Sequence, residues 1–380
     1  MTGVAGAWRW WSVSVVALLI WVVPGCAPKG GGVAKKAIKI GAILPLTGEA
    51  AKYGETSKKA IDMAVAEING AGGVRGSKLE VVYEDDQAKS VNGLSAFQKL
   101  ATVDKVPAVI GAMASSVTLA IAPVAERQKI VLLSPMSSNP KITQSGDYIF
   151  RNCISDLLEG SEMAKYAVQK LHLERVAILY INNDYGVGLR DVFKKTFEPL
   201  GGQVVAAEAF PQGGTDFRAQ LAKIKAARPE GVYLVGYNEM IQIFKQAKEM
   251  GLRTQFLSTI MLNDPSLVKQ TAGAADGAVL TAWAYDPKSR NMAMHAFVEA
   301  FRQRYGVEPD VFAAQAYDAA KLIAKAMASA GITPSEIKKG LHSVRDYPGA
   351  SGTTTFDSNG DVVKPLRFLR ISKGMFVPVS

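Results

Sequence analysis

The strongest constraint on the fold of this chain is the alternation of short β-branched runs with longer segments of helical periodicity. In the longer segments apolar residues recur every three or four positions, as Ile61, Val65 and Ile68 do, which is typical of amphipathic helices. The predicted strands are 38–44, 79–84, 108–110, 130–133, 175–181, 203–209, 231–235, 255–258 and 278–281. The predicted helices between them are 53–69, 91–102, 116–127, 157–171, 188–197, 217–227 and 239–250. Such alternation predicts an α/β fold with mostly parallel sheets covered on both faces.

The alternation occurs twice, once before about residue 155 and once after it, which predicts two α/β lobes. The C-terminal third has a different pattern. Its predicted helices are 291–305, 312–330 and 334–342, and its predicted strands are 352–356 and 366–371, with a turn at 357–360 between the strands.

The N-terminus predicts export. Residues 10–23 form an apolar run that is shorter than the roughly 20 residues of a membrane span and fits the core of a secretory signal peptide. The run ends at Val23-Pro24-Gly25-Cys26, which resembles the lipobox of bacterial lipoproteins, although Pro24 departs from that pattern. We therefore expect a signal peptide over 1–25, lipidation of Cys26 and a flexible tether over 26–36. An uncleaved anchor helix or an ordinary secretory signal is the alternative.

Composition excludes several classes of protein. Two Cys among 380 residues exclude a disulfide scaffold and Cys-rich metal modules, and three scattered His leave little for a metal centre. The net charge of +10 is dispersed over helices that also carry acids, without the interleaved basic and aromatic residues of single-strand binders. We expect no cofactor, no metal and no nucleic acid.

Catalytic motifs are also missing from the sequence. It contains no GxSxG elbow, Walker A loop, HExxH or CxxC. Gly186-Val187-Gly188 is an incomplete dinucleotide motif, because Asp191 stands where the third glycine belongs. Cys153 is interpreted as inert packing, and Asp85-Asp86 as a loop closure or helix cap. We expect that the protein is not an enzyme.

The loops after the strands predict a small-molecule site. In open α/β sheets ligands bind beyond the carboxyl ends of the strands. Ser115 is predicted at a helix N-terminus, which favours an anion such as a carboxylate, and Ser137-Ser138 supply further polar groups. The loops also carry three tyrosines that could enclose the apolar part of a ligand, namely Tyr53, Tyr185 and Tyr237.

Several segments resemble one known family. They are IKIGAILPLTGEAAKYGE, AVAEINGAGGVRG, VPAVIGAMASS, LLSPMSSNPKIT and NNDYGVGL. These segments are similar to the leucine/isoleucine/valine-binding proteins, which are type I periplasmic substrate-binding proteins of ABC importers. The resemblance implies two Rossmann-like lobes joined by three crossovers around a ligand cleft. On that pattern lobe 1 comprises 37–155 with 285–351, and lobe 2 comprises 156–284 with 352–380.

The resemblance also implies binding residues. Tyr53 matches the aromatic residue of the first loop and Ser115 the serine that binds the ligand carboxylate. Ser138 stands in place of the family's threonine in a loop where Met136 offers its carbonyl. The full expected set is Tyr53, Ser115, Met136, Ser137, Ser138, Tyr185 and Tyr237.

One family position does not match. Members that bind branched-chain amino acids carry an acidic residue that pairs with the ligand ammonium, and Ile260 aligns with it here. A buried ammonium without a partner is strongly disfavoured. Either another acid replaces it, such as the nearby Glu239 or Asp264, or the ligand has no amine.

The resulting hypothesis is an extracytoplasmic, monomeric binding lipoprotein that closes on a small carboxylate, amino acid or organic acid, and delivers it to an ABC permease. Its only attachment to the membrane would be the lipid on Cys26. A ligand-sensing receptor domain of the same fold is the alternative, and an enzyme on an α/β scaffold is the least favoured hypothesis.

Overall fold

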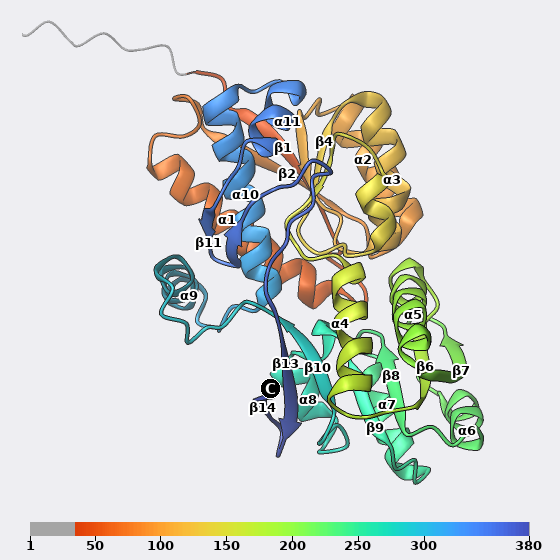
Figure 1. Ribbon diagram of the computed structural model, residues 1–380. Helices are drawn as coiled ribbons and strands as arrows, with labels where there is room; N and C mark the ends of the chain where they lie inside the picture. Colours follow the sequence, from red (N-terminus) through yellow and green to blue (C-terminus); the bar gives the residue numbers. More distant parts are fainter. Residues whose placement is uncertain (1–34, 380) are drawn as a thin grey trace, which may run out of the picture. The chain divides into compact units, whose positions relative to one another are not determined.

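A computed structural model describes residues 35–379 of the chain (Figure 1). The signal peptide and Cys26, predicted above, lie outside these residues. The described residues form one compact unit that contains two main sheets, one of five strands and one of seven. None of the described helices is long and apolar enough to cross a membrane.

The first sheet is entirely parallel and belongs to the lobe drawn at the top of Figure 1. Its strands, in spatial order, are β2 (Leu79–Asp85), β1 (Ile38–Leu44), β3 (Ala108–Ile110), β4 (Val131–Ser134) and β5 (Ile149–Arg151). Helices α1 (Ala51–Gly70), α10 (Val311–Ala330) and α11 (Pro334–His342) cover one face, and α2 (Ser90–Thr102) and α3 (Ser115–Gln128) cover the other.

Alternation along β1 explains why both faces are covered. Ile40, Ala42 and Leu44 are fully buried in the cluster that includes α1 and α10, whereas Ile43 is buried in the cluster with α2 and α3. Successive side chains of a strand point to opposite faces, so an apolar run without polar interruptions needs cover on both sides. After the exposed Lys39, the strand is therefore buried on both faces and lies in the interior of the lobe.

The second sheet is parallel in its centre and antiparallel at one edge. Its strands, in spatial order, are β14 (Met375–Val379), β13 (Leu366–Ser372), β10 (Val279–Trp283), β9 (Gln255–Ser258), β8 (Gly231–Val235), β6 (Arg175–Ile181) and β7 (Gln203–Phe210). The accompanying helices are α4 (Asp156–Gln169), α5 (Asp184–Phe197), α6 (Arg218–Ala226), α7 (Met240–Glu249) and α8 (Pro265–Gln270).

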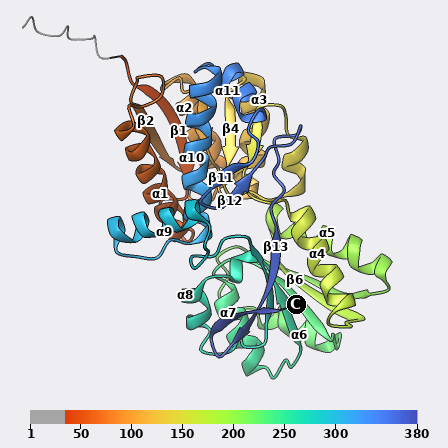
Figure 2. The ribbon, with the colours of Figure 1, turned by 60° about the vertical axis from the view of Figure 1, so that its left-hand side comes forward.

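The chain passes between the lobes three times, which Figure 2 shows from a second side. It leaves the first sheet after β5, returns after β10 through α9 (Met292–Tyr305), and leaves again between β12 (Gly352–Thr354) and β13. Strand β12 pairs only with β11 (Tyr347–Gly349) in a small antiparallel sheet. The exact lobe boundaries stay a prediction.

The third passage carries a buried polar cluster. Lys364 donates to the Ser351 hydroxyl at 2.8 Å and to the Gln315 amide oxygen at 3.2 Å, and Asn152 also donates to Gln315. Asp318 accepts from the backbone amide of Ser351 at 2.8 Å. These bonds join the first and third passages to α10, although the side-chain oxygen of Asn152 and the side-chain nitrogen of Gln315 have no hydrogen-bond partner among the described residues.

Candidate functional site

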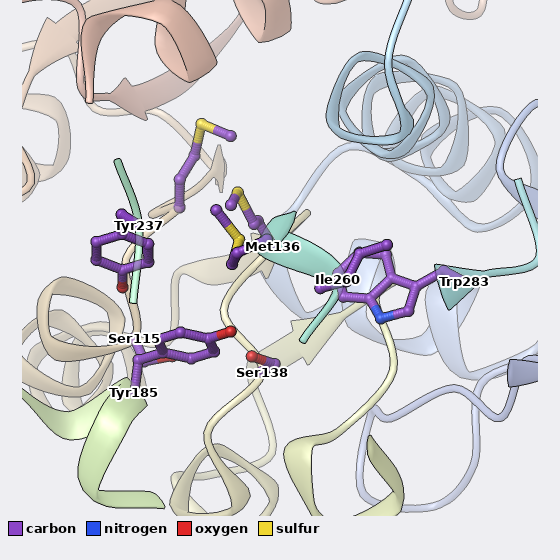
Figure 3. Close-up of a pocket in the computed structure, with 9 residues that line it drawn as sticks. Ser115, Met136, Ser138, Tyr185, Tyr237, Ile260 and Trp283 are labelled. Atoms are coloured by element: carbon purple, nitrogen blue, oxygen red, sulfur yellow. The ribbon is translucent and has the colours of Figure 1, made fainter. Parts of the chain in front are cut away.

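A narrow pocket lies between the two lobes at the ends of their strands (Figure 3). The space left in it is about 10 Å³, which is enough for about one water molecule. Five of the seven predicted binding residues line it, together with four that were not predicted as ligand contacts. The lining residues are Met113, Ser115, Met136, Ser138, Tyr185, Tyr237, Ile260, Met261 and Trp283.

Ser115 is placed by a tight loop at the end of β3. It is the first residue of α3, and the preceding Gly111 has a φ of 138°. A Cβ atom at Gly111 would lie 2.5 Å from the Ile43 carbonyl oxygen, so only glycine fits this approach to β1. The first amides of a helix lack intrahelical acceptors, and Ser115 therefore presents its hydroxyl where an anion is favoured.

Ser138 is held by the loop that follows β4. The Ser134 hydroxyl donates to the Ala112 carbonyl at 2.6 Å and accepts from the Ser137 amide at 2.9 Å, which joins this loop to the one before Ser115. The fully buried Arg151 donates to the carbonyl oxygens of Ser138 and Asn139, both at 2.9 Å. The position of Ser138 thus depends on groups that do not themselves line the pocket.

Two predicted residues lie elsewhere. The Ser137 hydroxyl is 2.7 Å from the Thr118 hydroxyl and donates to the carbonyls of Ala112 and Met113, so its bonding capacity is used inside lobe 1. Tyr53 packs edge-on against Phe312 and lines a second, larger cavity of about 270 Å³. Glu49 and Glu239 are among the other residues of that cavity.

Tyr185 and Tyr237 form one wall of the pocket. Their rings stack with centroids 5.4 Å apart and an interplanar angle of 11°. The Tyr185 hydroxyl donates to Thr259 at 2.9 Å, and burial raises the pKa of both tyrosines, which therefore stay neutral. Gly186 permits this arrangement, because a Cβ atom there would lie 2.0 Å from the Ile181 carbonyl oxygen.

The opposite end of the pocket is apolar. Ile260 and Trp283 lie there in Figure 3, and three methionines complete the lining. Trp283 was missed because the predicted strand ended at residue 281, whereas β10 continues to Trp283. Met113 and Met261 were in loops already singled out, but nothing in their spacing showed that their side chains face a ligand.

The structure places Ile260 in the pocket lining, and neither acid considered as its replacement lies there. Glu239 accepts from the amides of Gly213 and Tyr237 at the second cavity. Asp264 caps α8 and pairs with Lys52 of α1. Neither residue is therefore placed to meet an ammonium group in this pocket.

Four polar contacts connect the two lobes beside the pocket. Asn139 donates to the Asp184 carbonyl at 2.5 Å, and the Asp184 amide donates to the Ser116 hydroxyl at 3.1 Å. Lys52 bonds to Asp264 and, at 2.6 Å, to the Ser266 hydroxyl. The lobes are therefore closed against each other.

The other residues that the sequence suggested for catalysis or metal binding are packed or hydrogen-bonded within the fold. Cys153 is fully buried, and burial raises the pKa of its thiol to about 12. Asp85 accepts from the amides of Leu46 and Gln87, and Asp86 accepts from Ala88, as expected of residues that close a loop. Within residues 35–379 no cluster of three or more His, Cys, Asp or Glu could hold a metal ion.

Comparison with known proteins gives consistent matches along the chain. The periplasmic binding protein family matches residues 37–375. A leucine-, isoleucine-, valine-, threonine- and alanine-binding protein of Pseudomonas aeruginosa is 30% identical over 331 residues, which cover 86% of this chain and 87% of the relative.

Two solved structures are similar as well. A branched-chain amino acid transporter substrate-binding protein of Streptococcus pneumoniae in complex with isoleucine is 31% identical, with a TM-score of 0.82 and coverage of 90% of this chain and 97% of the other. A solute-binding protein of an R. palustris ABC transporter in complex with benzoate is 22% identical, with a TM-score of 0.82 and coverage of 90% and 95%. The second likeness concerns the fold alone.

Proposed function

The chain belongs to the periplasmic binding protein family, among the leucine/isoleucine/valine-binding proteins, and on this premise we propose that it captures a small carboxylate between its lobes for an ABC permease. The predicted type I fold, with two Rossmann-like lobes around a cleft, is confirmed. The protein is a substrate-binding protein and not an enzyme. The ligand class, closure and delivery are the proposal.

The observation that carries the proposal is the polarity of the pocket. Ser115 and Ser138 come from neighbouring loops of lobe 1, and Ser115 begins a helix of 14 residues. Hydroxyls and unpaired helix amides together favour a carboxylate. The rest of the lining is aromatic or apolar, which suits an uncharged side chain on the ligand.

We propose that the lobes close on the ligand because the residues that line the pocket come from both lobes. Lobe 1 supplies the serines and lobe 2 supplies both tyrosines, so a ligand contacts both sets only when the lobes are together. A ligand that binds the closed form better shifts the population toward it. We propose that the closed pair of lobes is the form that a permease recognises.

The location of the protein forms part of the same proposal. We propose an extracytoplasmic protein held at a membrane by lipidated Cys26, a residue outside the described range, and monomeric in solution. Incorporation of labelled palmitate in a bacterial host tests this part. Labelling of the wild type and none of Cys26→Ala is expected, and equal labelling would contradict it.

A thermal-shift screen of the mature protein against amino acids and small organic acids tests the binding function. At least one carboxylate should raise the unfolding midpoint, because a ligand that binds only the folded state stabilises it. Ser115→Ala should weaken that ligand about tenfold, the loss of one charge-assisted hydrogen bond of about 1.5 kcal/mol. Ser95→Ala is the control, since Ser95 is exposed on α2 and bonds only to Val91 of its own helix. Equal affinities in the two variants would remove Ser115 from the site.

A further inference from the structure

The second cavity, of about 270 Å³, is built by both lobes and contains two acids. Lobe 1 contributes Glu49 and Tyr53, at the loop after β1 and the start of α1. Lobe 2 contributes the loops that follow β7 and β8, the second of which carries Glu239. Tyr237 lines this cavity as well as the first pocket, so the two spaces adjoin each other.

The two acids of this cavity meet at Gly213, in the loop after β7. A Cβ atom at Gly213 would lie 2.5 Å from a carboxylate oxygen of Glu49. The backbone amide of Gly213 donates to the Glu239 carboxylate at 2.8 Å. Glu49 is held in place, because the Asn238 side chain donates to its carbonyl at 3.2 Å. Two negative charges from opposite lobes therefore approach the same residue.

No cationic side chain among residues 35–379 pairs with either acid. Lys52 lies one helical turn after Glu49, but it bonds to Asp264 and Ser266. Glu239 is only 7% exposed, and its carboxylate accepts from backbone amides alone. A buried carboxylate favours a partner of opposite charge, and like charges brought together by closure repel each other. The cavity therefore favours a cation.

Tyr53 adds an unpartnered acceptor to the same cavity. Its side chain is 4% exposed, and its hydroxyl is buried without a hydrogen-bond partner among the described residues. Burial raises the pKa of this tyrosine, and the nearby acids Asp264 and Asp310 add to the rise. Tyr237 and Glu239, which line the cavity, contribute as well. The neutral hydroxyl lies near these two residues and can accept a hydrogen bond from an ammonium group.

The lining suits an organic cation better than a metal ion. Within residues 35–379 no three or more His, Cys, Asp or Glu side chains come together at a possible metal site, and Glu239 already accepts from two amides. Aromatic rings attract cations, and Tyr53 and Tyr237 supply two of them. The volume approaches the roughly 300 Å³ at which pockets for small organic ligands begin. A protonated amine on a short carbon chain meets these conditions.

We propose that the second cavity is a cation-binding site that receives the protonated amine of a small organic molecule between Glu49 and Glu239. The site lies outside the carboxylate pocket and so adds to the proposed function. The amine is either the far end of the ligand in the first pocket, joined to it by an uncharged chain that passes Tyr237, or a separate molecule. In both cases it contacts both lobes, so its binding favours the closed form.

Isothermal titration of the mature protein with matched probes tests this site and distinguishes the two sources. The first arm compares 5-aminopentanoate with pentanoate and 6-aminohexanoate with hexanoate, which differ only in the far amine. The second arm compares 1,5-diaminopentane with 1,5-pentanediol, neither of which has a carboxylate. In one arm the wild type should prefer the amine by at least about tenfold, as expected for one charged hydrogen bond.

Glu49→Gln shows whether the preference arises in this cavity. The preference for the amine should fall by about threefold or more, and the affinity for the partner without the amine should stay within about twofold, because an exposed charge is lost but no buried bond. Glu80→Gln is the matched control, since Glu80 is exposed near the start of β2, at the end of the sheet away from the cleft. It should leave the preference unchanged.

Glu239→Gln removes the second charge and should also lower the preference for the amine. This variant loses an acceptor for a backbone amide, so its thermal unfolding midpoint without ligand is compared with that of the wild type first. If it does not fold, Glu49→Gln alone decides the test.

The results separate this site from the proposed function. Equal affinity for amines and their partners in both arms, or no binding of any amine, would overturn the inference. A preference that Glu49→Gln leaves unchanged, or that Glu80→Gln lowers equally, would overturn it too. Ser115-dependent binding of pentanoate or hexanoate without any gain from the amine would support the proposed function and overturn the cation site alone.

Discussion

Arg151 joins the pocket-lining loop that carries Ser138 to the third passage between the lobes. Its guanidinium forms two bonds of 2.7 Å with the carboxylate of Asp361 and also holds the Ser138 and Asn139 carbonyls. The backbone amide of Arg151 donates to the Gly360 carbonyl at 3.0 Å. One buried side chain thus connects a pocket loop to the third passage between the lobes.

Removing this cation should destabilise the fold. In Arg151→Met the buried part of Asp361 and two loop carbonyls lose their partner, and breaking a buried pair costs about 3–5 kcal/mol. Denaturant unfolding should show a loss of this size. Arg218→Met is the control, because Arg218 forms exposed pairs with Asp216 and Glu249 whose loss should cost less than about 1 kcal/mol. Similar losses in both variants would contradict the prediction.

Lys364 gives the free energy of unfolding a specific dependence on pH. Burial lowers the pKa of its ammonium from 10.5 to about 8, against the opposing effect of the neighbouring Asp318. Between these values the unfolded chain binds a proton that the folded chain has released, so stability rises as pH increases from about 8 toward 10.5. Below the folded pKa this dependence ends.

Urea unfolding measured at several pH values between about 7.5 and 9.5 tests this effect, because this range includes the folded pKa of Lys364. The wild type should become more stable with pH, and Lys364→Met should lose most of that slope. Lys338→Met, which removes a lysine paired only with the exposed Asp147, should retain it. Burial of the Cys153 thiol, which raises its pKa to about 12, gives a slope of opposite sign at the upper end of this range, so the two proteins are compared: equal slopes in the wild type and Lys364→Met would show that Lys364 titrates normally.

Pocket-lining residues were predicted best where their position follows directly from the order of strands and loops. Ser115 and Ser138 line the pocket as expected of residues that follow strands, and Ile260 was singled out because a family position lacks its acid; their contacts with a ligand stay a prediction. Glu159 of α4, fully buried behind the pocket, was missed because an acid near a helix start is usually solvated. Its carboxylate accepts from the Ile260 amide and the Thr281 hydroxyl, and sequence spacing does not contain that information.

At the scale of elements, α1 and α8 form an ionic contact across the cleft. Lys52 lies in α1, Asp264 is the N-cap of α8, and 46% of the Lys52 side chain remains exposed. The pair exists only when the lobes are closed, so it contributes to closure but not to the stability of either lobe. Its exposure limits the contribution to about 1 kcal/mol at most.

Lys52→Met should therefore weaken ligand binding by up to about fivefold, and less at high salt, because ions screen exposed pairs. Titration of the tightest ligand from the thermal-shift screen at low and high salt measures both effects. Lys58→Met is the control, since Lys58 pairs with Asp62 inside α1 and does not reach lobe 2. An equal effect of the two variants would argue against a role of Lys52 in closure.

Most elements inside the two α/β repeats were predicted closely, whereas several short elements outside them were missed. Strands β1, β3, β6, β8 and β9 match their predicted bounds. Strands β5 and β11 have three residues each, too few to show a period, and β14 is missing from the prediction because it is an exposed edge strand containing Pro378. Helix α5 begins at Asp184, earlier than predicted, because Asn183 caps it by accepting from the Gly186 amide.

At the scale of the whole molecule, Gly188 limits how the lobes meet. It lies in α5 of lobe 2, and a Cβ atom there would be 2.5 Å from the side-chain nitrogen of Asn139 in lobe 1. That nitrogen is held by the Asp184 carbonyl, and the Asn139 oxygen by the Lys141 amide, so the side chain is not free to move away. A methyl group at residue 188 would affect the closed form alone.

Gly188→Ala should lower ligand affinity while leaving the unfolding free energy equal or higher. Overpacking of the interface costs about 1–3 kcal/mol, and alanine is favoured over glycine within a helix by about 1 kcal/mol. Small-angle scattering with and without ligand should show less compaction than in the wild type. Gly70→Ala is the control, since no atom lies within 4 Å of its added methyl group. Full compaction of Gly188→Ala would exclude this steric effect.

The small residual volume of the pocket has a kinetic consequence. A space for about one water molecule has no room for an amino acid, so the ligand enters only after the lobes have parted. Each opening then acts as a first-order gate before binding. In stopped-flow experiments the observed association rate should rise with ligand concentration and then level off at the opening rate, so that abundant ligand fills the protein no faster than its own hinge allows.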